Sequence, residues 1–237
     1  MSTDSSGPAR VFVLRHGRTT WNAQNRYQGQ ADPPLDDVGR AQAVAAAALL
    51  ATFRPDLIVT SDLQRAAATA AALEAATGLV AAPDPRLRER SLGHWEGLTR
   101  DEVEAAYPEE FAQWRAGRNV TRRGGETREQ VTVRTRELFA SLPDVPAVVL
   151  VTHSATALAL TEAVLGLDHE RHILGPLANC HWSELQRADS PAADGSTQWR
   201  LRAHNAGAPG GIVPHLPSAG DTGVDSPDAE ALDAAAR

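Results

Sequence analysis

Three short apolar runs divide the chain, and each is followed at once by polar residues. The runs occupy residues 11–14, 56–60 and 148–152. They are rich in valine, leucine and isoleucine, which is typical of parallel strands that are covered on both faces. Arg15-His16-Gly17 follows the first run, and His153-Ser154 follows the third. The pattern predicts a buried parallel sheet with a histidine at the carboxyl end of two strands.

Helical signals lie between and after these runs. Asp36 is suited to cap the first predicted helix, and Gly78 and Gly166 stand where two later helices should end in a left-handed turn. Thr127 and Gln130, three residues apart, have the sequence of a capping box. The four predicted helices are 41–52, 63–76, 127–142 and 154–165.

The segment from residue 80 to residue 125 gives mixed signals. It contains two short helical stretches, 101–106 and 109–116, and no further apolar run. We predict that about 99–123 form a short helical cap over the carboxyl ends of the strands.

The order of the elements predicts the fold class, which is three-layer α/β/α with a mostly parallel sheet. Segments 182–186 and 199–203 alternate between apolar and polar residues and should close the sheet as an antiparallel pair. We expect one domain over 10–206, preceded by a polar leader at 1–9. Residues 207–237, rich in glycine, proline, alanine and aspartate, are expected to form a disordered tail. In such sheets ligands bind beyond the carboxyl ends of the strands.

Charge and composition exclude several classes of protein. The formal net charge is −7, which disfavours nucleic acid binding. All 23 basic residues are arginine, so lysine Schiff-base chemistry and a Gly-Lys-Ser/Thr phosphate loop are excluded. We see no signal-peptide core and no apolar run that would span a membrane, and Cys180 is the only cysteine. We expect a cytoplasmic protein without nucleic acid or membrane partners. Homo-oligomerisation is left open.

A small set of residues near the predicted strand ends suits phosphoryl transfer. The set is Arg15, His16, Arg65, Glu89 and His153. A neutral imidazole attacks phosphorus, arginine binds phosphate oxygens in a bidentate way, and a carboxyl group moves the proton of the leaving alcohol. Each residue alone has a simpler interpretation. Glu89 between Arg88 and Arg90, for example, would be a surface ion pair.

Several motifs in a fixed order favour the role in phosphoryl transfer over these simpler interpretations. They are Leu14-Arg15-His16-Gly17, Tyr27-Gln28-Gly29, Ser61-Asp62-Leu63-Gln64-Arg65, Leu87-Arg88-Glu89, Gly93-His94-Trp95-Glu96-Gly97, Gly124-Gly125-Glu126-Thr127 and Val151-Thr152-His153. Together they resemble the signature of the histidine phosphatase superfamily, in its phosphoglycerate mutase-like branch. The resemblance extends over about 10–206.

This resemblance implies a role for each residue of the set. His16 would accept the phosphoryl group, and Glu89 would be the acid and base. Arg15, Arg65 and His153 would form the phosphate pocket. The substrate-binding candidates are Asn22, Gln28, Gly29 and Ser154. Ser154 stands where the family usually has glycine, so it narrows the space and adds a hydroxyl. The resemblance implies a small-molecule phosphate ester as substrate, with no metal and no cofactor.

Three functions fit these motifs. A phosphatase is favoured over a phosphoglycerate mutase. Mutases of the family resemble one another in a longer insert with a substrate-binding lysine, whereas this chain has a short cap and no lysine. A catalytically silent binding module is disfavoured, because none of the five pocket residues is missing. Leu177-Ala178-Asn179-Cys180-His181-Trp182 and other C-terminal motifs resemble the glucosyl-3-phosphoglycerate phosphatases within the family.

The cap carries a group of arginines with two interpretations. They are Arg115, Arg118, Arg122 and Arg123. They form either a solvated basic loop or, if Arg122 and Arg123 face the pocket, a site for a second anionic group of the substrate.

Overall fold

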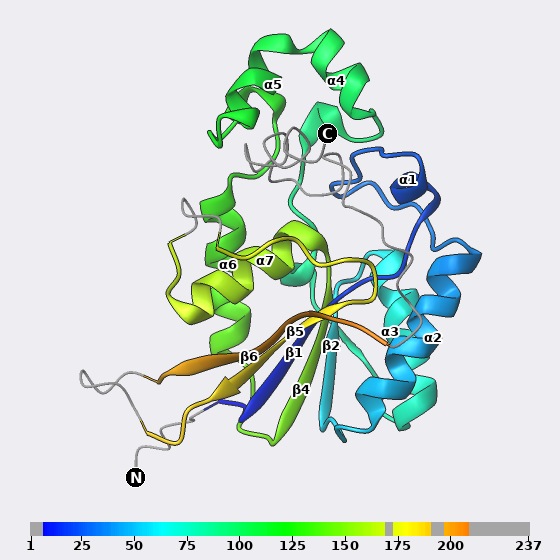
Figure 1. Ribbon diagram of the computed structural model, residues 1–237, viewed down its shortest axis with the longest axis vertical. Helices are drawn as coiled ribbons and strands as arrows, with labels where there is room; N and C mark the ends of the chain where they lie inside the picture. The colour runs from blue at the N-terminus through cyan, green and yellow to red at the C-terminus, as the bar shows by residue number, and fades with distance from the viewer. Residues whose placement is uncertain (1–6, 169–172, 191–196, 209–237) are drawn as a thin grey trace, which may run out of the picture.

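The computed structural model describes residues 7–168, 173–190 and 197–208 and contains one six-stranded sheet between two layers of helices (Figure 1). The strands are β1 (Arg10–Arg15), β2 (Leu57–Thr60), β3 (Ala82–Pro83), β4 (Ala147–Thr152), β5 (Trp182–Arg187) and β6 (Trp199–Ala206). Their order across the sheet is β3-β2-β4-β1-β5-β6. Strands β1 to β4 are parallel to one another, whereas β5 and β6 are antiparallel to their neighbours. The prediction of a mostly parallel α/β sheet closed by an antiparallel pair is confirmed.

The structure describes seven α-helices, and all of them except α1 agree closely with the predicted segments. They are α1 (Thr20–Ala23), α2 (Asp37–Ala51), α3 (Gln64–Thr77), α4 (Arg100–Ala106), α5 (Pro108–Arg115), α6 (Arg128–Ala140) and α7 (Ser154–Leu165), with 3-10 turns η1 (Pro85–Leu87), η2 (Gly93–Trp95) and η3 (Thr121–Arg123). Asp36 caps α2 by accepting a hydrogen bond from the Gly39 amide at 2.7 Å. The capping box of Thr127 and Gln130 begins α6. Gly78 ends α3 in the left-handed conformation, as predicted.

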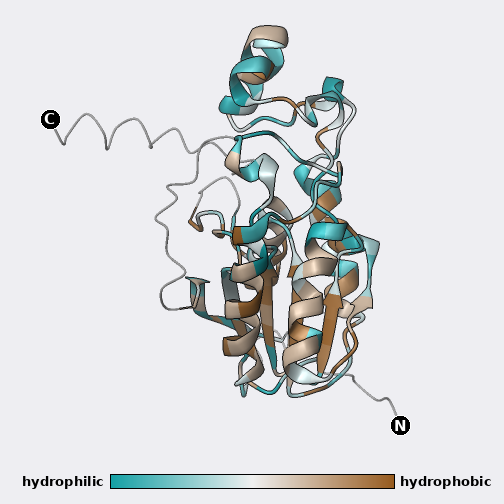
Figure 2. Cartoon of the chain, turned by 90° about the vertical axis from the view of Figure 1, so that its right-hand side faces the viewer, coloured by the Kyte–Doolittle hydropathy of each residue, from teal (hydrophilic) through white to brown (hydrophobic). Residues whose placement is uncertain are grey.

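Alternate side chains of the central strands point to opposite faces of the sheet, and each face has its own apolar cluster. Phe12 and Leu14 of β1 pack with buried residues of α2 and α3. Val11 and Val13 pack on the other face with α6 and α7. Figure 2 shows brown strands between helices whose ribbons mix brown, tan, white and teal residues. Because both faces are covered, the middle of each central strand is a continuous apolar run.

The cap has a third apolar cluster, separate from the two clusters of the sheet. Its buried members are Tyr27, Leu92, Trp95, Val103, Phe111, Trp114 and Val120. Helices α4 and α5 stand apart from the sheet, beyond the carboxyl ends of the strands (Figure 1). Two chain segments connect the cap to the rest of the domain, and they cross closely at glycines. A Cβ on Gly93 would lie 1.8 Å from the Arg123 carbonyl oxygen, and one on Gly125 would lie 2.2 Å from that of Ser91.

Strand β1 begins and strand β6 ends at the limits of the predicted domain, 10–206. The predicted tail at 207–237 lies outside the described residues except for its first two positions, and most of the leader at 1–9 lies outside them too. Both stay predictions. No helix among the described residues has the length and apolar character needed to cross a membrane.

Candidate active site

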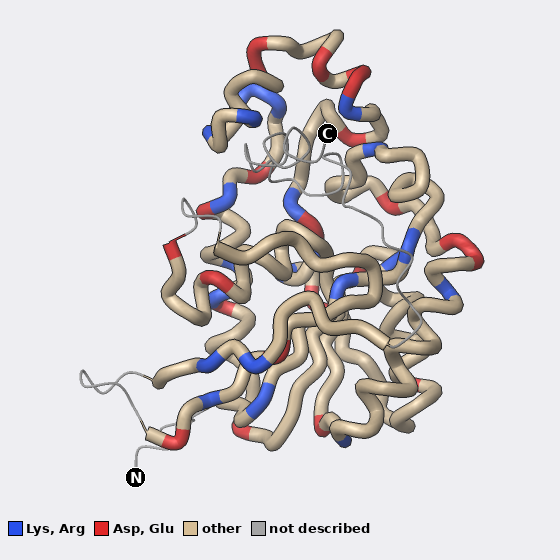
Figure 3. The backbone as a smooth tube through the Cα atoms, viewed as in Figure 1, with Lys and Arg blue, Asp and Glu red and all other residues tan. Residues whose placement is uncertain are grey.

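A cavity opens beyond the carboxyl ends of the parallel strands. Its lining residues are Arg15, His16, Arg26, Tyr27, Gln28, Gly29, Arg65, Glu89, Arg90, Leu92, Ser154 and Ala155. Figure 3 shows central strands that are largely uncharged, with basic and acidic residues beyond the strand ends, in the cap and on the outer strands β5 and β6. The cavity brings together four of the five residues expected to carry phosphoryl transfer.

His16 directly follows β1 and is only 2% exposed. Its Nδ1 lies 2.7 Å from the Gly17 carbonyl oxygen. A carbonyl oxygen only accepts hydrogen bonds, so Nδ1 carries the proton and Nε2 keeps its lone pair. Burial lowers the pKa of His16 well below its usual value, and the charges of Arg65 and Arg15 lower it further. His16 is therefore a neutral imidazole with a free nitrogen, the form that a nucleophile requires.

His153 lies behind His16, with its ring centroid 5.0 Å from that of His16. Arg65 Nε donates to His153 Nδ1 at 3.2 Å, so Nδ1 must be unprotonated. The ring proton is then on Nε2, which donates to Ser61 Oγ at 2.9 Å. Burial, followed by the Arg65 charge, lowers the pKa of His153 well below its usual value. His153 is fully buried and holds Arg65 and Ser61 together from behind the cavity wall.

The guanidinium of Arg65 is fixed by the loop after α1. Nη1 donates to the Ala31 carbonyl at 2.7 Å, and Nη2 donates to the Gly29 carbonyl at 2.8 Å. Gly29 has φ +49°, and a Cβ there would lie 2.2 Å from a carboxylate oxygen of Glu96. This close approach explains why glycine is required at position 29. Arg15 is anchored in the same manner, since its Nη1 donates to the Leu177 carbonyl at 2.6 Å.

Glu89 binds the N-terminus of α7. Its Oε1 accepts from the amides of Arg90 at 2.8 Å and Thr156 at 3.1 Å, and its Oε2 accepts from the Ala155 amide at 3.2 Å. The Thr156 hydroxyl is also 3.0 Å from Oε1. A carboxylate is stabilised at a helix N-terminus by free N–H groups and by the helix dipole. Glu89 is thus held at the cavity, and the interpretation as a surface ion pair is wrong.

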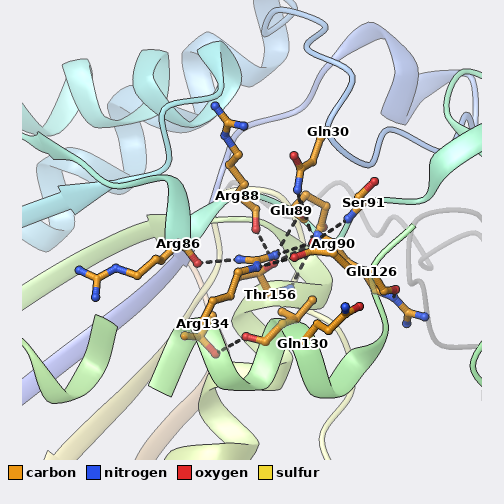
Figure 4. Close-up of polar contacts among 12 residues, drawn as sticks. Gln30, Arg86, Arg88, Glu89, Arg90, Ser91, Glu126, Gln130, Arg134 and Thr156 are labelled. Carbon is orange, nitrogen blue, oxygen red and sulfur yellow. Dashed lines mark hydrogen bonds and ion pairs between the residues drawn. The ribbon is translucent and has the colours of Figure 1, made fainter. Parts of the chain in front are cut away.

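The loop that carries Glu89 is held by Arg134 of α6 (Figure 4). Arg134 donates to the carbonyl oxygens of Arg86 at 2.6 Å and Glu89 at 3.3 Å. It also forms a two-point ion pair with the Glu126 carboxylate, at 2.9 and 3.1 Å. Gln30 donates to the Glu89 carbonyl from the opposite side. The backbone of Glu89 is therefore fixed from two elements.

The substrate-binding candidates are divided by the structure. Gln28, Gly29 and Ser154 line the cavity. Asn22 is buried outside the lining, where its Oδ1 accepts from Thr19 and from Asn179. The Ser154 hydroxyl is buried and has no hydrogen-bond partner among the described residues.

The cap arginines do not form a pocket. Arg115, Arg118 and Arg122 are exposed. Arg123 is buried, with its guanidinium carbon 5.2 Å from the Trp95 ring centroid, and burial lowers its pKa to about 9. None of the four lines the cavity in the part of the chain that the structure describes.

Sequence reasoning missed several residues of the site. Ser61 and Thr156 hold His153 and Glu89, while Arg90 lines the cavity next to Glu89. Ser61 and Arg90 each adjoin or lie within a motif that drew attention, but nothing in their spacing distinguishes them from surface residues. Within the described ranges, no group of three or more histidine, cysteine or acidic side chains is arranged to hold a metal ion.

Comparisons with known proteins agree with this geometry. A family model described as "Histidine phosphatase superfamily (branch 1)" matches residues 11–194. The chain is 44% identical over 215 residues to a glucosyl-3-phosphoglycerate phosphatase of Mycolicibacterium vanbaalenii, covering 84% of this chain and 95% of that protein. It is 37% identical over 190 residues to a probable phosphoglycerate mutase of Yersinia enterocolitica, covering 77% and 86%. A solved mycobacterial glucosyl-3-phosphoglycerate phosphatase in complex with inorganic phosphate has a TM-score of 0.71 and 39% identity, over 84% of this chain and 98% of that chain.

Proposed function

We propose that this chain, which belongs to branch 1 of the histidine phosphatase superfamily and is a phosphomonoester hydrolase, works through a phosphorylated His16 on glucosyl-3-phosphoglycerate or a closely related ester. The observation that carries the proposal is the state of His16. It is a neutral imidazole whose protonated nitrogen is turned to the Gly17 carbonyl, in a cavity that is also lined by four arginines and the carboxylate of Glu89.

In the first step, Nε2 of His16 attacks the phosphorus, and the bond from phosphorus to the ester oxygen breaks. Arg15 and Arg65 bind the non-bridging oxygens and stabilise the charge that spreads over them in the transition state. Glu89, protonated, gives its proton to the departing alkoxide. The products are phosphohistidine, a Glu89 carboxylate and the free alcohol.

In the second step, water attacks the phosphohistidine. Glu89 takes a proton from the water, and the bond between Nε2 and phosphorus breaks. Inorganic phosphate leaves, and both residues return to their starting protonation. The four donors around Glu89 stabilise its carboxylate between the two steps.

The choice of substrate is supported by the relatives. A phosphatase named for glucosyl-3-phosphoglycerate is 44% identical over nearly its whole length. The mutase alternative has less support, because the chain has no lysine and its cap contains only two short helices in the described residues. The silent-module alternative has none, because all five residues of the phosphoryl-transfer set lie together.

The test is to replace His16 with alanine. We expect turnover of glucosyl-3-phosphoglycerate to fall by at least about 10³-fold, since no other group at the cavity replaces the nucleophile. The folded structure should persist, because a loop at a strand end contributes little to the core. His94→Ala, in the turn η2 just before the cap and outside the cavity lining, is the matched control and should keep normal activity. Comparable activity in both variants, at equal unfolding midpoints, would overturn the proposal.

The intermediate gives a second readout. Phosphohistidine survives alkali and is lost in acid, so wild-type protein quenched in alkali during turnover should gain one phosphoryl group by intact mass. The His16→Ala variant should gain none.

A further inference from the structure

Arg90 is a buried cation in the wall of the cavity. It directly follows Glu89 in the chain and is 8% exposed. Its Nε donates to the Glu126 carbonyl oxygen at 3.0 Å. Its two terminal nitrogens, Nη1 and Nη2, have no hydrogen-bond or ion-pair partner among the described residues. Burying a guanidinium costs free energy when its N–H groups have no hydrogen-bond acceptors. When such a guanidinium lines a binding cavity, its N–H groups are available to a ligand.

The neighbouring arginines are satisfied within the protein. Arg86 pairs with Asp84 and Arg88 pairs with Asp62, and the side chains of Arg86 and Arg88 are 36% and 40% exposed. Arg26 also lines the cavity, but its Nη1 binds Glu102 and a carbonyl. In the described chain, Arg90 therefore differs from these arginines in having no acidic partner.

The position of the Arg90 guanidinium is fixed. Its amide binds Oε1 of Glu89, its Nε binds the Glu126 carbonyl, and the Glu126 carboxylate is paired with Arg134 (Figure 4). Burial is the main cause of the lowered pKa of Arg90, and the nearby charge of Arg128 adds to it. The charges of Glu89, Glu129 and Glu126 oppose this lowering of the Arg90 pKa, although none of these carboxylates is paired with its terminal nitrogens in the described chain. The guanidinium is therefore held at a constant position relative to Glu89.

A second hollow adjoins the cavity at Arg90. It is smaller than the first cavity and shares Arg90 and Ala155 with it. Its other walls are Val131, Leu158, Ala159 and Arg128, and Arg128 is paired with Glu162. Arg90 thus lies between the cavity and the second hollow.

From this geometry we infer that Arg90 binds a second anionic group of the substrate, a carboxylate attached near the phosphate ester. Nη1 and Nη2 would contact the two carboxylate oxygens side by side, the arrangement that arginine favours. The inference rests on the proposed function and deepens it, because it names the residue that selects phosphoglycerate-type esters over esters of neutral alcohols. It also replaces the prediction for Arg122 and Arg123, which lie outside the lining.

The experiment measures binding separately from turnover. Dissociation constants of 3-phosphoglycerate and glycerol 3-phosphate, which differ by the carboxylate, are measured by calorimetry on the His16→Gln protein and on the same protein with Arg90→Gln. We expect Arg90→Gln to raise the dissociation constant of 3-phosphoglycerate by about 10- to 100-fold, which is the range for losing a hydrogen bond to a charged group. The dissociation constant of glycerol 3-phosphate should rise by less than about threefold. Arg88→Gln, on the same loop, is the control and should change neither constant.

Kinetics on the enzyme with His16 intact provide the second arm. For glucosyl-3-phosphoglycerate and its uncharged carboxamide, Arg90→Gln should remove the preference for the carboxylate form, and Arg90→Lys should restore part of it. Equal losses for both ligands would assign Arg90 a structural role and overturn the inference, as would no loss for either. If the binding arm succeeds while His16→Ala remains active, the proposed mechanism fails and the carboxylate site stands.

Discussion

The contact between Arg134 and Glu126 supports the loop that carries Glu89 and lies outside the cavity lining. Its removal therefore tests the structure separately from substrate binding. In Arg134→Met, the side chain keeps its apolar length but loses every donor. The carbonyl oxygens of Arg86 and Glu89 lose a partner, and the Glu126 carboxylate loses its cation. We expect the free energy of unfolding to fall and Glu89 to be held less firmly in its position.

The size of the effect follows from burial. Removing one member of a fully buried ion pair costs about 3–5 kcal/mol. The side chains of Arg134 and Glu126 are 16% and 23% exposed, so solvent screens part of the interaction. We therefore expect a loss of about 2–3 kcal/mol in the free energy of unfolding. For a domain of this size, that corresponds to a fall of about 4–12 °C in Tm.

The assay is urea unfolding followed by circular dichroism, with kcat measured in parallel. Arg136→Met is the matched control, because Arg136 is exposed on the same helix and should change the free energy of unfolding by no more than about 0.5 kcal/mol. The double variant Arg134→Met/Glu126→Gln should lose less than the sum of the single losses, because the two side chains interact. Equal stability in Arg134→Met and Arg136→Met, or strictly additive losses in the cycle, would refute the reasoning.

Three further predictions concern the chemistry. Glu89→Gln should reduce kcat much more for alkyl phosphate esters than for p-nitrophenyl phosphate, whose leaving group needs little protonation; equal losses would mean that Glu89 is only structural. His16 and His153 are neutral when folded, with lowered pKa values, and take up protons only when unfolded, so the free energy of unfolding should fall as pH drops below about 6.5, by up to about 1.4 kcal/mol per pH unit for each histidine. Urea titrations at pH 7 and pH 5.5 should show a smaller fall in His16→Gln, and an unchanged fall would contradict the neutral state. Because arginine supplies the positive charge around His16, activity should survive EDTA and be inhibited by orthovanadate, whereas a loss that Mg²⁺ restores would argue for a metal.

Much of the fold could be predicted because burial on both faces imposes a continuous apolar sequence. The central strands and the helices that cover them carry that pattern, and their ends are marked by Asp36, Gly78 and the capping box at Thr127. Strand β3 was missed, since its two residues, Ala82–Pro83, are exposed and carry no pattern. A strand this short is specified by the neighbour it pairs with, not by its own sequence.

The candidate site was predictable where a residue stands at a strand end or in a motif, as His16 and Arg65 do. It was not predictable where the decision depends on packing. Arg86, Arg88 and Arg90 alternate along one short loop, and only the third turns inward. The one hydrogen bond described for the Arg90 side chain goes to the carbonyl oxygen of Glu126, which lies 36 residues further along the chain.

The separate apolar cluster of the cap has a consequence for how this enzyme could diversify. The cluster shares none of its buried members with those of the sheet, and its two connections cross at Gly93 and Gly125. Residues of α4 and α5, which lie between these glycines, can change in sequence or length while the sheet and His16 keep their packing. A chimera that exchanges 93–125 with the matching segment of a relative should therefore fold and keep its nucleophile. Recombination at this pair of glycines would let the protein accept new substrates while it keeps the same catalytic residues.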